Sequence, residues 1–149
     1  NSVVQACIPS VLTPEKGSND EKSLIQYGKE YVNLLESNSK ASIELSKNCN
    51  GLEVIEAQGA MYAMVKVQID NLTGVKDDKD FAVQLLNEEN LIVLPGSCFG
   101  CTNFVRILTC PKQEVIKDAM ERMQAFCDRR SKDSSPGTKR KAEEEAEAA

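Results

Sequence analysis

The chain of 149 residues contains no histidine. Histidine is the side chain that enzymes use most often as a general base, it is a frequent metal ligand, and it activates serine and cysteine nucleophiles. Its absence excludes all of these sites. Any chemistry in this chain must therefore use carboxylates, lysines, thiols or a bound cofactor.

Two further absences concern location and partners. No run of apolar residues is long enough to cross a bilayer, and the first residues form no secretory signal. The net charge of −5 argues against a nucleic-acid-binding surface. We therefore expect a cytoplasmic protein, with a mitochondrial location left open, that binds neither nucleic acid nor membrane.

The six cysteines fall into two groups. Cys98 and Cys101 form a C-x-x-C pair in the segment PGSCFGCTNFVRI, and the others lie singly in apolar segments, at Cys7, Cys49, Cys110 and Cys127. A chain of this size does not depend on disulfides. Single cysteines in such segments are typical of reduced, partly buried thiols.

The C-x-x-C pair raises the hypothesis of a zinc or redox protein. A structural zinc site needs further cysteine pairs or histidines, and the chain has neither a second C-x-x-C nor a histidine. A redox dithiol usually begins a helix, whose N-terminus lowers the thiol pKa, whereas Cys101 is followed by the strand-like segment TNFVRIL. Both chemistries are therefore disfavoured, and we expect no metal site.

The apolar spacing along the chain predicts alternating helices and strands. The expected elements are the end of a preceding helix (1–12), a long helix (20–47), two strands within 52–69 interrupted at Gln58 and Gly59, a helix (77–90), strands at 91–94 and 104–109, and a last helix from Pro111. This order predicts an α+β fold in which a small, mostly antiparallel sheet packs against helices on one face. Residues 1–130 form one domain, and 131–149 are expected to be a disordered charged tail.

Arg106 stands in the last predicted strand, between Val105 and Ile107. A strand arginine usually faces solvent or pairs with a carboxylate. Here the strand follows a Pro-Gly-Ser loop, so the guanidinium can also point into a cleft beside that loop. An arginine in such a place grips a carboxylate through two parallel hydrogen bonds, each worth about 1.5–3 kcal/mol.

Tyr62 follows Gly59 in the segment AQGAMYAM. A glycine just before a strand often marks a turn or bulge, and the aromatic residue after it often belongs to the core. The residues alone leave this reading and a functional one equally open.

Several segments, in one order, resemble the C-terminal part of a fold type I pyridoxal-phosphate-dependent aminotransferase. They are VVQACIPSVL (3–12), QGAMYAMVKV (58–67), FAVQLLNEENLIVLPGSCFG (81–100), NFVRI (103–107) and AFC (125–127). Within that family the chain is most similar to the tyrosine aminotransferases, with the alanine aminotransferases as near relatives. The resemblance covers residues 1–130, and the tail from 131 matches nothing in the family.

The resemblance implies a role for each candidate residue. Arg106 falls on the arginine that binds the α-carboxylate of the amino-acid and 2-oxo-acid substrates, and Tyr62 would lie near the substrate pocket. The lysine that binds pyridoxal phosphate belongs to a large domain preceding this segment, so no catalytic residue is expected here and the segment alone would be inactive. Such enzymes are typically homodimers, and the small domain closes over the large one.

Lys47 is a candidate for the cofactor lysine, because Leu45-Ser46-Lys47 is similar to the sequence around that lysine in the family. In the family a basic loop with proline and glycine follows that lysine, whereas NCNGLEV follows Lys47. We interpret Lys47 as a cation at a helix C-terminus. Two alternatives to a tyrosine-aminotransferase-like domain stay open: an alanine-aminotransferase-like domain and a non-enzymatic module with the same fold.

Overall fold

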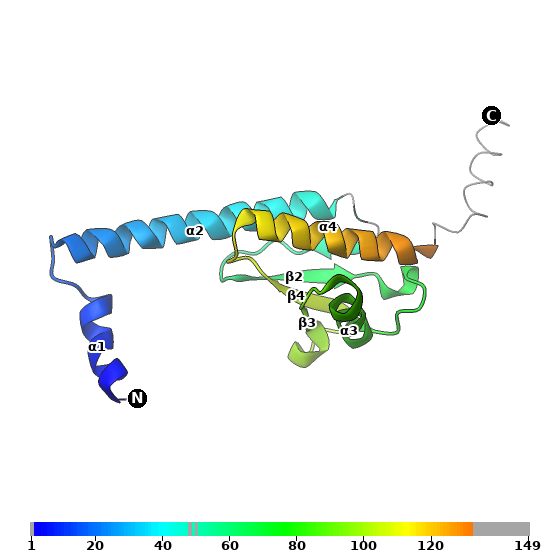
Figure 1. Cartoon of the computed structure of the whole chain (residues 1–149), viewed down its shortest axis with the longest axis horizontal. Helices are drawn as coiled ribbons and strands as arrows, with labels where there is room; N and C mark the ends of the chain where they lie inside the picture. The colour runs from blue at the N-terminus through cyan, green and yellow to red at the C-terminus, as the bar shows by residue number, and fades with distance from the viewer. Residues whose placement is uncertain (1, 48, 50, 133–149) are drawn as a thin grey trace.

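The computed structural model describes residues 2–47, 49 and 51–132. The elements along the chain are α1 (Ser2–Leu12), α2 (Asn19–Ser46), β1 (Leu52–Val54), β2 (Tyr62–Val67), a short 3-10 helix η1 (Ile69–Asn71), α3 (Asp78–Glu89), β3 (Leu94–Pro95), a second 3-10 helix η2 (Gly96–Phe99), β4 (Phe104–Leu108) and α4 (Gln113–Arg130). Figure 1 shows α2 and α4 lying side by side along the sheet, while α1 projects away from it.

The four strands form one antiparallel sheet in the order β1-β2-β4-β3. In the central pair, Met64 lies opposite Arg106 and Val65 opposite Val105. The predicted α+β fold with a small antiparallel sheet is therefore confirmed.

Alternation along the strands separates the two faces of this sheet. One face belongs to the core, which joins strand residues such as Val65 and Val105 to Phe81 of α3 and to Phe126 of α4. The rings of Phe81 and Phe126 meet edge to face with their centroids 5.4 Å apart, a favourable aromatic geometry. The helices thus cover one face, and the other face carries partly exposed side chains, Tyr62 and Arg106 among them.

Two of the helices begin at capping side chains. Ser18 precedes α2 and accepts a hydrogen bond from the backbone N–H of Glu21, while the Glu21 carboxylate accepts one from the backbone N–H of Gly17. Asp77 caps α3 and accepts from the backbone N–H of Asp80. Both caps satisfy backbone donors that the first helical turn leaves unpaired.

Two predicted boundaries were wrong. Only Leu94 and Pro95 pair with β4, whereas a strand over 91–94 was expected. Ile92 is 77% exposed, so this segment is less buried than its apolar sequence indicated. The last helix begins at Gln113 instead of Pro111, with Lys112 as its N-cap, and the Pro111 carbonyl before it accepts a hydrogen bond from the Asn38 side chain.

The predicted tail begins inside the packed part of the chain. Ser131 is buried and forms an isolated β-bridge with Leu72. The Lys132 side chain donates a hydrogen bond to the Asp70 carbonyl. Residues 131 and 132 are therefore ordered, and the remainder of the predicted tail, 133–149, lies outside the described residues.

The cysteines are all free. Cys49 and Cys127 are buried as expected, but Cys7 is exposed, because no residue of α1 is buried. A hydrogen bond with Cys49, together with burial, raises the pKa of the Cys127 thiol. The Cys127 thiol is therefore protonated and unreactive at neutral pH.

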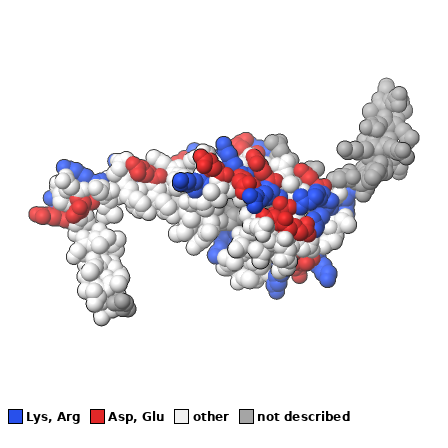
Figure 2. Space-filling view, viewed as in Figure 1, with Lys and Arg blue, Asp and Glu red and all other residues white. Residues whose placement is uncertain are grey.

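Charged side chains are distributed unevenly over the surface. Figure 2 shows side chains of both signs gathered over α4, and few charges over α1. Val3, Val11 and Leu12 of α1 are each more than half exposed. Among the described residues, no helix is long and apolar enough to span a membrane.

Candidate functional site: an arginine between aromatic rings

Arg106 and Tyr62 come together on the open face of the sheet. Tyr62 pairs with Leu108 across β2 and β4, so it is the diagonal neighbour of Arg106 on that face. The Arg106 Cζ atom lies 4.4 Å from the centroid of the Tyr62 ring. The alternative of Tyr62 as a core aromatic is excluded, since this side chain is 39% exposed.

Phe99 provides a second ring beside the same cation. The Arg106 Cζ atom lies 4.2 Å from the centroid of the Phe99 ring. Both distances are well inside the range of cation–π attraction. These ring contacts leave the five N–H groups of the guanidinium available to donate hydrogen bonds.

No carboxylate among the described residues pairs with Arg106. Its half-buried guanidinium therefore differs from an ordinary strand arginine, which is either paired or fully solvated. A half-buried cation with unused planar donors is suited to bind an external carboxylate.

The loop that carries Phe99 is closely packed against β4. A Cβ atom at Gly96 would lie 2.3 Å from the Cys101 carbonyl oxygen and 2.7 Å from Phe104 Cβ, so only glycine fits there. Gly100 has a φ of 78°, which lets the chain turn back after η2. The Pro-Gly-Ser loop predicted from the sequence thus directs Phe99 toward Arg106.

Asp78, in the first turn of α3, anchors this loop. It is 2% exposed, and its Oδ2 atom accepts a hydrogen bond of 2.7 Å from the Ser97 backbone N–H. Burial alone would raise the pKa of the Asp78 carboxyl, but the hydrogen bonds that its charged form accepts, that from Ser97 first, lower it. The ionised carboxylate thereby ties α3 to the segment that positions Phe99.

We expect Asp78→Asn to destabilise the protein by about 1–2 kcal/mol at pH 7, because a charge-assisted hydrogen bond becomes a neutral one. A lowered pKa in the folded state means that this contribution is complete above the ordinary Asp pKa. It is lost as the pH falls through the folded value. Urea unfolding of this single-domain chain and its Asp78→Asn variant between pH 7 and about pH 3 should therefore show the difference shrinking in acid.

Asp70→Asn is the matched control for this prediction, since the Asp70 side chain is exposed. It should change the unfolding midpoint little at any pH. A difference between wild type and Asp78→Asn that stayed constant down to the acid limit would contradict the role of the charge.

An apolar groove of about 460 Å³ adjoins the cation. Arg106 and Tyr62 line it together with residues of the 91–94 segment and of α4, such as Leu94, Val115 and Met120. A carboxylate bound at Arg106 would therefore have apolar surface beside it.

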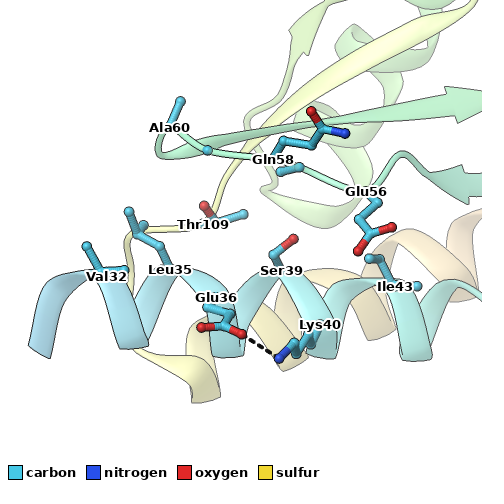
Figure 3. Close-up of a pocket in the computed structure, with 12 residues that line it drawn as sticks. Val32, Leu35, Glu36, Ser39, Lys40, Ile43, Glu56, Gln58, Ala60 and Thr109 are labelled. Atoms are coloured by element: carbon cyan, nitrogen blue, oxygen red, sulfur yellow. Dashed lines mark hydrogen bonds and ion pairs between the residues drawn. The ribbon is translucent and has the colours of Figure 1, made fainter. Parts of the chain in front are cut away.

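A second pocket, of about 410 Å³, lies between α2 and the segment 56–60. Figure 3 shows Glu36 and Lys40 on its α2 wall, joined by an ion pair with Nζ and Oε1 2.5 Å apart. A hydrogen bond from Lys40 lowers the pKa of the Glu36 carboxyl. Neither Arg106 nor Tyr62 lines this pocket, and the ion pair leaves Glu36 and Lys40 mutually neutralised.

The other candidates from the sequence lie apart from the Arg106 cation. Cys98 and Cys101 are exposed in and just after η2, and the described residues include no group of three or more histidine, cysteine or acidic side chains that could hold a metal ion. Lys47 ends α2 and pairs with Glu44, with Nζ and Oε1 2.6 Å apart. Phe99 was not predicted from the sequence as a residue of this site. The signal that could have identified it is its position as an aromatic residue between the two cysteines of the loop.

Residues 5–123 match the family described as aminotransferase class I and II. Tyrosine aminotransferase of Dictyostelium discoideum is 30% identical over 132 residues, which are 89% of this chain and 30% of the relative. Cystine lyase CORI3 of Arabidopsis thaliana is 30% identical over 137 residues, which are 91% of this chain and 30% of that relative. The chain thus spans 30% of the length of both proteins.

The fold is also similar to that of a solved aminotransferase structure. The crystal structure of tyrosine aminotransferase from Leishmania infantum superposes with a TM-score of 0.67 at 32% identity. The matched part covers 70% of this chain and 26% of that structure.

Proposed function

Because the chain belongs to the class I and II aminotransferases, we propose that it is the C-terminal, substrate-binding domain of an enzyme that transfers an amino group from tyrosine or a related amino acid to a 2-oxo acid. The observation that carries this proposal is the Arg106 guanidinium, held beside two aromatic rings and paired with no carboxylate among the described residues. Amino-acid and 2-oxo-acid substrates share the α-carboxylate that such a group binds. The apolar groove beside Arg106 supports an aromatic donor.

Pyridoxal phosphate is the cofactor that the family implies. The described residues around Arg106 do not form a site for it, since they offer one cation and two rings, and the lysine on the same sheet face, Lys66, lies near Glu53. When bound, the cofactor supplies the carbanion chemistry of amino transfer. We propose that it is held by a large domain of the intact enzyme and that this chain only binds and orients the substrate.

We propose that the large domain packs on α1, since the apolar side chains of that helix are exposed here. Closure of the small domain would bring Arg106 onto the substrate carboxylate and exclude water. The intact enzyme is proposed to be a homodimer.

The test uses the full-length enzyme loaded with pyridoxal phosphate, with tyrosine and tyramine as matched donors. Tyramine lacks only the carboxylate, so we expect its kcat/KM to be lower by roughly 10²–10⁴-fold, the equivalent of two charge-assisted hydrogen bonds. Equal kcat/KM values for the two donors would contradict a carboxylate-binding role for Arg106.

Three further results distinguish the alternatives. A preference for alanine over tyrosine would identify an alanine aminotransferase. Repeated turnover without a 2-oxo-acid acceptor would indicate a lyase. A cofactor-loaded protein that converts no amino acid would favour the non-enzymatic module.

A further inference from the structure

Phe99 is a large apolar side chain without a place in the core. It is 48% exposed and stands outside the buried cluster that joins the sheet to the helices. Its ring contact is with Arg106, at 4.2 Å. An exposed ring that contacts the cation of a substrate-binding site calls for a functional explanation.

The two rings beside Arg106 are held by different parts of the fold. Tyr62 begins β2, in the middle of the sheet, and its position is fixed by the strand register with β4. Phe99 ends η2, whose place depends on the close approach of Gly96 to Phe104 and on the hydrogen bond from Ser97 to Asp78. The guanidinium therefore lies against one ring from the sheet and one ring from an anchored loop.

A long side chain without an ion pair samples many rotamers, and a ligand must select the competent one. Arg106 has no carboxylate partner among the described residues that would fix it. Its guanidinium lies against the Tyr62 and Phe99 rings, and these two contacts limit where its N–H donors point.

We propose that Phe99 is a positioning residue, which together with Tyr62 holds the Arg106 guanidinium ready for a substrate carboxylate. This inference rests on the proposed function. It assigns to the loop between Cys98 and Cys101 a role in substrate affinity that depends on the aromatic ring and is independent of the thiols.

The experiment titrates the full-length holoenzyme with hydrocinnamate, an aromatic carboxylate without an amino group. Phe99→Leu keeps an apolar side chain but removes the π face, and we expect it to weaken hydrocinnamate binding by about 3- to 30-fold. KM for tyrosine should rise by a similar factor. The kinetic constants for tyramine should not change, because tyramine has no carboxylate for Arg106 to bind.

Two variants control for the loop itself. Phe99→Tyr keeps an aromatic ring at this position, so this variant should bind hydrocinnamate as wild type does. Cys98→Ser, at an exposed neighbouring position, should also bind as wild type does. If Phe99→Leu does not accumulate as folded protein, Phe99→Met gives the same comparison with a larger apolar side chain.

Each outcome separates the two proposals. If Arg106→Ala weakens hydrocinnamate binding but Phe99→Leu and Phe99→Met do not, the positioning role is overturned and the proposed function stands. If Arg106→Ala itself leaves hydrocinnamate binding unchanged, the carboxylate-binding role fails. Equal losses with tyrosine and tyramine in Phe99→Leu would mean that the ring only supports the fold, which also overturns the proposal.

Discussion

Replacing Arg106 by alanine in the full-length enzyme is expected to lower kcat/KM for tyrosine by roughly 10²–10⁴-fold. The estimate follows from the loss of two charge-assisted hydrogen bonds of about 1.5–3 kcal/mol each, with a factor of ten for about every 1.4 kcal/mol. We expect KM to rise for both the amino acid and the 2-oxo acid, and turnover to fall because the substrate is oriented less well. The absorbance of the bound cofactor should not change, since Arg106 is not proposed to touch it.

Arg106→Lys tests whether the shape of the guanidinium matters as well as its charge. A lysine ammonium is a point charge without the planar fork of donors, and it stacks less well on aromatic rings. We therefore expect an intermediate kcat/KM. A lysine variant with full activity would mean that charge alone explains binding, and the contacts with Tyr62 and Phe99 would then have no functional role.

Lys66 provides the matched control. It is a cation of the same strand face as Tyr62, but it lies near Glu53 and is half exposed. Lys66→Ala should change kcat/KM little, because Lys66 lies near Glu53 and does not line the groove beside Arg106. An unchanged KM in Arg106→Ala would remove the role assigned to this residue.

The sequence was most informative where a pattern depends only on local geometry. Apolar residues at helical spacing located α2 and α4, and the strand predicted around Arg106 is observed as β4, in which Val105 is buried and Arg106 is partly exposed. Such patterns follow from the helical and strand periods alone, so they can be found without any knowledge of tertiary structure.

What could not be predicted depends on contacts between distant segments. The register that sets Met64 opposite Arg106 joins residues far apart in the chain, and the apolar run at 91–94 gave no sign that only its last residue would pair. Phe99 lies against Arg106 because the close approach of Gly96 to Phe104 holds η2 beside β4, and such an approach depends on residues that are neighbours in space. The C-x-x-C spacing marks the loop that carries Phe99, and the residue that contacts Arg106 lies between the two cysteines.

Asn38 illustrates a third case, a polar residue at an apolar position of a helix pattern. It falls in the spacing that located α2, yet its side chain is fully buried and its Nδ2 atom donates to the Thr109 and Pro111 carbonyl oxygens, at 2.8 and 2.7 Å. Thr109 is 1% exposed, and its own N–H donates to the Met61 carbonyl. One amide therefore satisfies two acceptors where the chain leaves β4 and approaches α4.

We expect Asn38→Ala to cost about 2–4 kcal/mol, because it leaves at least one buried carbonyl unpaired and removes packing. In a multidomain enzyme global unfolding is not two-state, so amide hydrogen exchange in α4 is the better measurement. Exchange in the first turns of α4 should accelerate, since that helix loses its tie to α2. Asn33→Ala, the same substitution at an exposed position of α2, is the control and should leave exchange unchanged.

Loss of the Asn38 hydrogen bonds is also expected to affect substrate binding, because Thr109 directly follows β4, the strand that carries Arg106. If Asn38 fixes the exit of that strand, Asn38→Ala should also raise KM for tyrosine, by less than Arg106→Ala does. Faster exchange with an unchanged KM would limit Asn38 to stability. Unchanged exchange would mean that the two hydrogen bonds contribute nothing, and that α2 is held to β4 by the apolar core alone.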